Sequence, residues 1–187
     1  MSFYDVIKES LRNEKIETRH LLIRPFQERD GEGLFEQFHD ADTMYMDGDT
    51  PLYEKDDNFR GRIKFIQSGE LIWFFIEMKE TKDYVGYILL KPADDRKVNT
   101  VEIGCSLTVN YQNKGLGYEA LTAVIELLKK HGTEMLTAKV WEKNIPSQKL
   151  VRKLQFVEEG VKHKSHLDPR TSEVTDTIMF YRLLTEK

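Results

Sequence analysis

Apolar and polar residues alternate over residues 101–109, and this is the clearest strand pattern in the chain. One face carries Val101, Ile103, Cys105, Leu107 and Val109, and the other carries Glu102, Gly104, Ser106 and Thr108. A period of two predicts a β-strand with one apolar face. From Leu116 the apolar positions recur at helical spacing, which predicts a helix that ends at His131 and Gly132. A glycine-rich segment, residues 112–117, therefore lies between a strand and a helix amino terminus.

The rest of the pattern predicts an amino-terminal amphipathic helix, then strands interrupted by further helices. Residues 1–13 have one apolar side, and a helix is expected from Asp30, as its cap, to about His39. The polar stretch 40–55 predicts a loop before a helix over 56–68, and a short helix is expected from Pro146 to about Leu154. Strands are expected at 16–26, 71–78, 84–90, 135–142, from Phe156 onward, and at the carboxyl end.

These elements predict a single α/β (α+β) domain. Successive strands joined by short turns indicate an antiparallel meander, and the strand–helix–strand piece after residue 101 adds a parallel pair. We expect a mixed, mostly antiparallel sheet of about seven strands with helices on both faces. Residues 1–15 would form a helical extension and residues 16–187 the main domain.

Composition narrows the classes of protein. The chain has 187 residues, a net charge of −4 and one cysteine, so bulk charge does not favour nucleic acid or anionic membranes. A lone cysteine excludes an intramolecular disulfide and a multi-cysteine metal site, and we expect no metal. No apolar run approaches the roughly 20 residues that span a bilayer, and the amino terminus lacks a signal-peptide core. A cytoplasmic monomer or homodimer is expected.

The glycine-rich segment has the chemistry of a phosphate site. At a helix amino terminus, backbone N–H groups and roughly half a positive charge from the dipole point at the ligand. Gly115 and Gly117 lack the Cβ atoms that would hold a phosphate off the backbone. Residues 115–120 also fit the G-x-G-x-x-A dinucleotide fingerprint, with Glu142 as a candidate ribose-binding acid. However, residues 110–114 separate the loop from its strand, and only one strand–helix–strand unit follows.

Four blocks of sequence resemble the GNAT superfamily of acetyl-CoA-dependent N-acetyltransferases. Gln112-x-x-Gly115-x-Gly117 is similar to its Q/R-x-x-G-x-G/A signature, and residues 17–26, ETRHLLIRPF, resemble the opening T-x-R-L-x-L-R-P of the RimJ/RimL-like branch. Residues 144–156 resemble the family's second block, with Gln155 in place of the usual glycine. Asp176 and Tyr181 resemble its closing hairpin. The four blocks, in order from Thr18 to Tyr181, favour coenzyme A over a dinucleotide.

The resemblance implies a sheet that splays in its middle, after Cys105, around acetyl-CoA. The backbone of residues 107–109 would pair with the pantetheine arm, and the loop would hold the pyrophosphate. The implied cofactor-binding residues are Leu107, Thr108, Val109, Gln112, Asn113, Lys114, Gly115, Leu116, Gly117, Tyr118, Asn144 and Ser147.

The resemblance also implies direct transfer to a primary amine in a ternary complex, without a covalent enzyme intermediate. Glu102 occupies the place of a general base that acts through water, and the alternative is an ordinary strand acid. Ser147 would donate to the leaving sulfur, or else cap a helix or bind the cofactor; the family's tyrosine acid is replaced by Val151. Neutralising a lysine amine at pH 7 costs about 4 to 5 kcal/mol and an α-amine about 1, so a modest base suits an amino terminus.

The acceptor stays open between a protein amino terminus and a small amine. The resemblance implies that the helix–loop–helix region over residues 30–68 forms one wall of the acceptor groove. Acids and tyrosines of its loop could attract a cationic amine: Asp42, Asp47, Asp49, Tyr45 and Tyr53. The alternative is a solvated loop. His163 and His166 flank a tail loop that could touch substrate. A non-catalytic acyl-CoA-binding or regulatory module is the alternative function from a different class.

Overall fold

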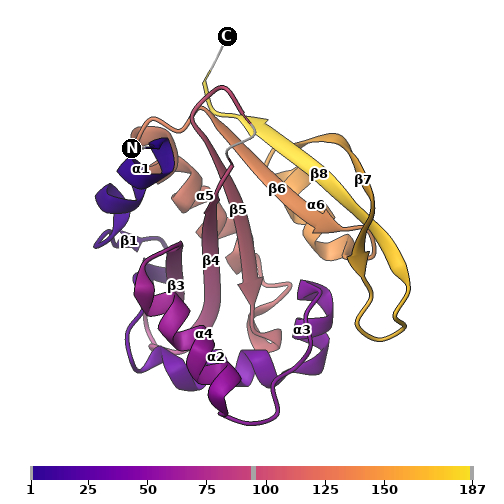
Figure 1. The fold of residues 1–187 in the computed structure, drawn as a ribbon. Coiled ribbons are helices and arrows are strands. Elements are labelled where there is room, and N and C mark those ends of the chain that lie inside the picture. Colours follow the sequence, from indigo (N-terminus) through magenta and orange to yellow (C-terminus); the bar gives the residue numbers. More distant parts are fainter. Residues whose placement is uncertain (1, 94–95, 186–187) are drawn as a thin grey trace.

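The computed structural model describes residues 2–93 and 96–185, which form a mixed sheet flanked by helices (Figure 1). The eight strands follow the spatial order β1-β2-β3-β4-β5-β6-β8-β7. Only β5 and β6 pair in parallel among these strands; every other neighbouring pair is antiparallel. The elements are α1 (Phe3–Leu11), β1 (Ile16–Glu17), β2 (Leu21–Arg24), α2 (Asp30–His39), α3 (Ala41–Asp47), α4 (Asp57–Ser68), β3 (Ile72–Met78), β4 (Tyr84–Pro92), β5 (Thr100–Leu107), α5 (Leu116–Lys130), β6 (Met135–Trp141), α6 (Ile145–Lys153), β7 (Val157–Leu167) and β8 (Val174–Leu183).

The sheet confirms the predicted fold class, with eight strands instead of about seven. The expected strand over residues 16–26 is a hairpin of two short strands, because Thr18 turns the chain. The Thr18 backbone N–H donates to the Leu21 carbonyl at 2.9 Å. Glu119 of α5 then fixes the turn by accepting hydrogen bonds from the Thr18 hydroxyl and the His20 backbone N–H.

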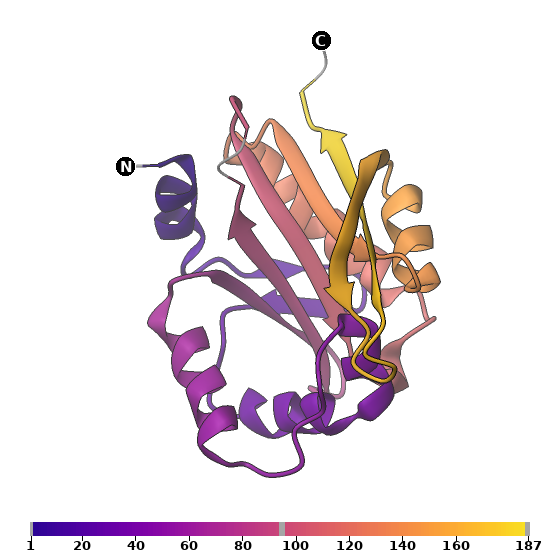
Figure 2. The same ribbon diagram turned by 45° about the vertical axis from the view of Figure 1, so that its right-hand side comes forward.

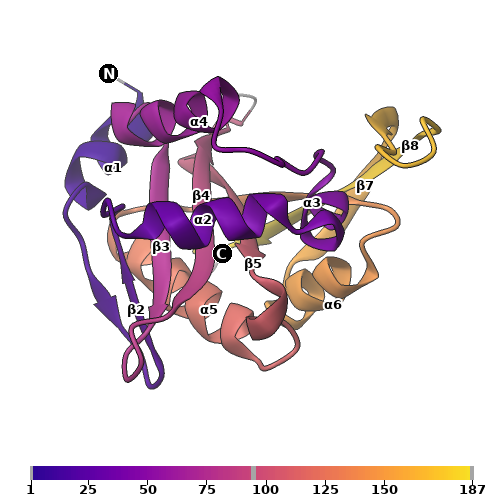
Figure 3. The same cartoon turned by 90° about the horizontal axis from the view of Figure 1, so that it is seen from below.

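Two separate hydrophobic clusters cover the two faces of the sheet. The first packs α1, α5 and α6 against the sheet, and the second packs α2, α3 and α4 against β3 and β4. Figure 3 shows α4 on one side of the strands, α5 and α6 on the other, and α2 crossing in front of β3 and β4. The prediction of helices on both faces is therefore correct.

Helix α1 belongs to the main core, although it comes from the predicted extension. Tyr4, Ile7 and Leu11 are buried in the first cluster. The Tyr4 hydroxyl donates to the Leu90 carbonyl at 2.6 Å and accepts from the Ile72 backbone N–H at 3.0 Å. Burial raises the pKa of Tyr4 to about 12, so this hydroxyl keeps its proton and its donor role.

Two local predictions between β2 and β3 are wrong. Residues 40–55 contain helix α3, which Asp40 caps through the Thr43 N–H at 2.7 Å and Gly48 ends in the left-handed conformation. Asp30 does not cap α2, since the N-cap position is Arg29.

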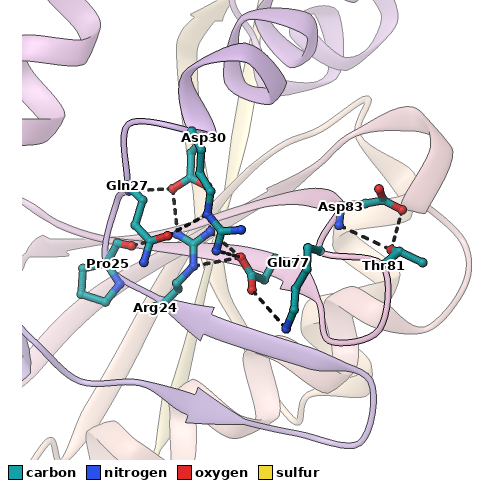
Figure 4. A network of polar contacts seen from close by, with 9 residues as sticks. Arg24, Pro25, Gln27, Asp30, Glu77, Thr81 and Asp83 are labelled. Atoms are coloured by element: carbon teal, nitrogen blue, oxygen red, sulfur yellow. Dashed lines mark hydrogen bonds and ion pairs between the residues drawn. The ribbon is translucent and has the colours of Figure 1, made fainter.

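Asp30 instead belongs to a buried ion network at the start of α2 (Figure 4). Both Asp30 carboxylate oxygens accept hydrogen bonds of 2.8 Å from Arg24. Glu77 of β3 accepts from the Arg24 Nε at 3.0 Å and from Arg29 at 2.7 Å. The network ties β2, β3 and α2 together, and it explains why an arginine stands before Pro25 at the end of β2.

The sheet divides between β5 and β6. The two strands pair only where Thr100–Glu102 faces Met135–Thr137, while β5 continues to Leu107 and β6 to Trp141. Figure 1 shows the two strands diverging below that point. The predicted splay is present, and it begins after Glu102 instead of after Cys105. The expected strand also stops at Leu107, because Val109–Tyr111 forms a 3₁₀ turn.

None of the helices in the described ranges combines the length and hydropathy needed to cross a membrane.

Candidate active site

A cavity of about 650 Å³ lies in the gap between β5 and β6. Its walls come from α3, β4, β5, α5, β6, α6 and the β7–β8 hairpin. The predicted cofactor residues that line it are Leu107, Gln112, Asn113, Gly115, Gly117, Tyr118, Asn144 and Ser147. Thr108, Val109, Lys114 and Leu116 lie outside this lining, and so does the predicted base Glu102. Cys105 also lines the cavity, where burial raises the pKa of its thiol to about 12.

The amino terminus of α5 opens onto this cavity. Gly115 is the N-cap residue and has a φ of 80°, a left-handed conformation that favours glycine. Its lack of a capping side chain leaves the first N–H groups of the helix available to a ligand. At Gly117 a Cβ atom would meet Leu107 and Leu150 only at ordinary contact distances of 3.4 and 3.5 Å, so neighbouring side chains do not demand glycine there. A helix amino terminus without a capping side chain has the chemistry to bind an anion such as a pyrophosphate.

The Gln112 side chain ties the glycine-rich segment to the end of β5. Its side-chain Nε2 donates to the Leu107 carbonyl at 2.9 Å, which joins the end of β5 to the glycine-rich segment. The Thr108 N–H donates to the Val85 carbonyl of β4 at 2.9 Å. This amide is therefore already bonded within the sheet, and the expectation that residues 107–109 pair with a pantetheine arm rests on Leu107.

Asn144 and Ser147 lie together at the start of α6. The Asn144 Oδ1 accepts from the Ser147 N–H at 3.0 Å, so Asn144 is the helix cap. The Asn144 Nδ2 donates to the Met46 carbonyl at 2.8 Å, which links α6 to α3 across the cavity. Asn144, and not Ser147, therefore caps α6.

Glu102 lies where β5 and β6 still pair, and two lysines surround it. Its carboxylate is 2.6 Å from the Lys139 Nζ and 3.8 Å from the Lys91 Nζ. Both lysines line the cavity, whereas Glu102 does not. The ion pairs hold this carboxylate behind two cations, an arrangement that suits structure or anion binding better than proton abstraction from a cationic amine.

Asp47, the last residue of α3, is the carboxylate that reaches the cavity. It accepts a hydrogen bond of 2.6 Å from the Ser106 hydroxyl, which accepts one of 2.7 Å from the Gln37 amide. The Tyr84 hydroxyl donates to the Gln37 carbonyl oxygen at 2.7 Å. Asp47 is exposed to solvent as a residue, but neighbouring groups partly desolvate its carboxylate. This desolvation raises the pKa of Asp47 to about 6, against the lowering effect of the Ser106 bond, and nearby Asp49 raises it further.

A second cavity, of about 560 Å³, lies on the other side of Asp47. It is bounded by α2, α3, α4, β3 and β4. Its lining is Phe38, Met44, Asp47, Asp49, Asp57, Asn58, Gly61, Arg62, Phe65, Ile66, Trp73 and Tyr87. Asp47 and Tyr87 line both cavities, so the two spaces meet at these side chains.

The other acids and tyrosines predicted for the acceptor wall have different surroundings. Asp42 pairs with Arg170, and Asp49 pairs with Arg62 at 2.8 Å. Tyr45 stacks edge-on against Trp141, and Tyr53 is 72% exposed beside His39. Within the described part of the chain, no lysine or arginine pairs with Asp47. The sequence named Asp47 as one of several groove acids, but only its position at the end of α3 sets it apart. Gly48, a typical helix C-cap, was the local signal for that helix end.

Figure 2 shows the tip of the β7–β8 hairpin beside α3, and hydrogen bonds join the two elements. The Tyr45 hydroxyl donates to Asp168 at 3.2 Å, and Arg170 donates to the Ala41 carbonyl at 3.3 Å. Lys143 bonds to Asp168 at 2.9 Å and holds the pKa of that carboxyl far below its usual range. His166 lies over the Trp141 ring, with centroids 4.7 Å apart, and lines the cavity. His163 instead pairs with Asp176 outside it.

No group of three or more His, Cys, Asp or Glu side chains in the described ranges is arranged to hold a metal ion.

The mixed sheet thus splits beside a glycine-led helix terminus, and two cavities meet at Asp47 and Tyr87. A model of the acetyltransferase (GNAT) domain matches residues 20–157. The chain belongs to this family, and the recognition from sequence is confirmed.

The chain is similar to other members over most of its length. It is 27% identical over 173 residues to YnaD, an uncharacterized N-acetyltransferase of Bacillus subtilis, covering 92% of this chain and 98% of the relative. An acetyltransferase (GNAT family) from Bacillus anthracis has a crystal structure that superposes with a TM-score of 0.79 at 25% identity, covering 92% of this chain and 100% of that one. The spermidine N-acetyltransferase of Vibrio cholerae, solved with CoA and spermine, shares the fold with a TM-score of 0.76 at 17% identity, covering 89% and 97%.

The family and the sheet order exclude the dinucleotide-binding alternative, which requires a doubly wound parallel sheet. Glu142, its candidate ribose-binding acid, instead accepts the Asp176 N–H at 3.1 Å.

Proposed function

We propose that this protein transfers the acetyl group of acetyl-CoA directly to a primary amine in a ternary complex. The observation that carries the proposal is the meeting of the two cavities at Asp47 and Tyr87. A cosubstrate in the split between β5 and β6 and an amine in the second cavity would face each other there. A related enzyme bound to both CoA and a polyamine supports a site for two ligands. The RimJ/RimL-like branch and a cytoplasmic location remain part of the proposal.

The residues of the site divide the work of the reaction. The amino terminus of α5, with Gly115 and Gly117, receives the pyrophosphate of the cosubstrate. Asp47 binds the ammonium form of the amine and accepts its proton. Ser147, on the wall formed by α6, is the candidate donor to the leaving sulfur. The thiol of CoA has a pKa near that of cysteine, about 8.5, so its thiolate leaves without strong acid help.

Glu102 remains the alternative base. Its ion pairs with Lys139 and Lys91 and its place outside the cavity lining favour Asp47.

Thermal shift measurements with acetyl-CoA, CoA and NAD test the cosubstrate. At about 100 times Kd a ligand adds roughly 2.7 kcal/mol of stability. Acetyl-CoA and CoA should raise the melting temperature and NAD should not. Stabilisation by NAD alone would overturn the proposal.

Two glycines at opposite ends of α5 provide a matched pair of variants. Gly115 has a φ of 80° and Gly132 a φ of 84°, and a Cβ atom would meet nothing within 4 Å at either position. Gly115→Ala and Gly132→Ala should therefore lose similar stability through backbone strain. Only Gly115→Ala should also lose the shift caused by acetyl-CoA.

Thiol release from acetyl-CoA in the presence of amines separates an enzyme from a binding module. A non-catalytic acyl-CoA-binding module would show the thermal shift but release no thiol with any amine.

A further inference from the structure

Four aromatic side chains contribute to the walls of the second cavity. Phe38 of α2, Phe65 of α4, Trp73 of β3 and Tyr87 of β4 all line it. The Trp73 and Tyr87 ring centroids are 5.1 Å apart, and those of Phe38 and Tyr87 are 6.4 Å apart. Met44 and Ile66 add apolar surface. Aromatic walls bury a flat apolar body well and also attract a cation through their ring faces.

The charges in this cavity leave room for one cation. Asp49 lies 2.8 Å from the Arg62 guanidinium, and Asp57 lies 2.7 Å from that of Arg60. These pairs neutralise two of the three acids in the lining, and Arg62 itself lines the cavity as a cation. Asp47, by contrast, is bonded to the Ser106 hydroxyl. A second ammonium group, as in a polyamine, would meet neutralised carboxylates and a guanidinium.

The strands beneath the cavity also offer little to an extended peptide. Strand β3 pairs with β2 and β4, and β4 pairs with β3 and β5. Strand β4 has no free edge, and β3 lacks a strand neighbour only over residues 72–74, where Ile72 already donates its N–H to the Tyr4 hydroxyl. A peptide amino terminus therefore has little edge on which to add its backbone. A space of about 560 Å³ instead falls within the range of small-molecule sites.

We propose that this cavity selects a small primary amine that carries one positive charge on a flat apolar body, such as an arylalkylamine, over polyamines and peptide amino termini. This inference rests on the proposed acetyl transfer and specifies its acceptor. The amine nitrogen lies at Asp47, where the two cavities meet, and the ring lies among Phe65, Trp73 and Tyr87.

Acetyl transfer at this position needs one proton transfer to Asp47 and one exchange of bonds at the thioester carbon. The ammonium group gives one proton to the Asp47 carboxylate, and the freed lone pair attacks the thioester carbon. The new carbon–nitrogen bond forms as the carbon–sulfur bond breaks. The thiolate leaves and takes the second proton from nitrogen, which yields the N-acetylated amine and the thiol of CoA. Asp47 then releases its proton to water through the cleft.

The test compares 2-phenylethylamine, spermidine and a short peptide with a free amino terminus, by thiol release at saturating acetyl-CoA. We expect kcat/KM for 2-phenylethylamine to exceed the other two values at least tenfold. An equal or higher value for spermidine or for the peptide would overturn the inference while leaving acetyl transfer intact. Failure of all three amines in a protein that binds acetyl-CoA would overturn the proposed function as well.

A matched pair of exposed aromatic residues tests the location of the ring. Phe65 is 40% exposed and lines the cavity, whereas Tyr53 is 72% exposed and does not. Phe65→Leu should lower kcat/KM for 2-phenylethylamine about fivefold, mainly through KM, and leave the acetyl-CoA thermal shift unchanged. Tyr53→Leu should change neither quantity. Equal effects of the two substitutions would refute the placement of the acceptor in this cavity.

Discussion

The Arg24 network gives the sharpest prediction about stability. Replacing Arg24 with Met keeps the length of the side chain and removes the buried cation, whose side chain is 2% exposed. Asp30 then keeps the Gln27 N–H at 2.7 Å, and Glu77 keeps Arg29 at 2.7 Å. Breaking a buried ion pair costs about 3 to 5 kcal/mol. Because both carboxylates retain one partner, we expect about 3 kcal/mol, the lower end of that range.

For a chain of this length 1 kcal/mol corresponds to about 2–4 °C, so Arg24→Met should lower the melting temperature by about 6–12 °C. The control is Arg60→Met, which removes an ion pair of similar length at the surface. Arg60 and Asp57 lie 2.7 Å apart with side chains 61% and 98% exposed. Its loss should cost less than about 1 kcal/mol. Thermal unfolding followed by circular dichroism measures both variants.

A second substitution provides a further measurement. Without the guanidinium the buried carboxylate of Asp30 loses the cation that balances its charge. Adding Asp30→Asn should restore part of the loss at pH 7. Equal melting temperatures for Arg24→Met and Arg60→Met would refute the reasoning.

Three further predictions concern the site and the sheet. Asp47→Asn should lower kcat, measured by thiol release, about 10²–10⁴-fold. Glu102→Gln should lower kcat less than about tenfold. A larger loss for Glu102→Gln than for Asp47→Asn would make Glu102 the base. Because Asp47 must be ionised to accept a proton and has a pKa of about 6, kcat/KM should rise with pH around that value. Ser106→Ala removes a hydrogen bond to the carboxylate and should therefore move the midpoint of this rise to higher pH. An unchanged midpoint would count against Asp47. A Cβ atom at Gly86 would lie 2.2 Å from the Ser106 carbonyl oxygen. Gly86→Ala should therefore lower the free energy of unfolding, measured in urea, by about 2–4 kcal/mol. At Gly31, a helical position, a Cβ atom would meet nothing within 4 Å, so Gly31→Ala should raise that free energy by up to about 1 kcal/mol.

Periodicity predicted most elements because the faces of this sheet are strongly apolar. Strand β5 and helix α5 have unbroken periods of two and 3.6, and the glycines at 69 and 132 mark helix ends that the structure confirms. The β1–β2 hairpin was not predicted, because its turn has no glycine or proline. The turn depends instead on hydrogen bonds to Glu119, about 100 residues away. Asp30 was misinterpreted for a different reason, because its carboxylate bonds to Arg24 and to the Gln27 N–H, both before the helix, instead of to the first N–H groups of α2.

At the site, too, the features that depend on contacts between distant residues could not be predicted from the sequence. The loop from Gln112 to Gly117 could be predicted because its chemistry is local to a strand, a turn and a helix end. The surroundings of Glu102 could not, because Lys91 and Lys139 reach it from the two neighbouring strands. Asp47 looked like one acid among several until the Ser106 and Gln37 bonds placed it between two cavities.

The two hydrophobic clusters have a consequence for how such enzymes diverge. The cluster beneath α2–α4 and the cluster that supports α5 share no buried residue. Substitutions at Phe59, Ile66 or Phe75 can therefore alter the packing around the second cavity without changing a residue of the cluster behind Gly115 and Gly117. Mutations confined to one half of the molecule can reshape that cavity while the packing that supports the amino terminus of α5 is kept.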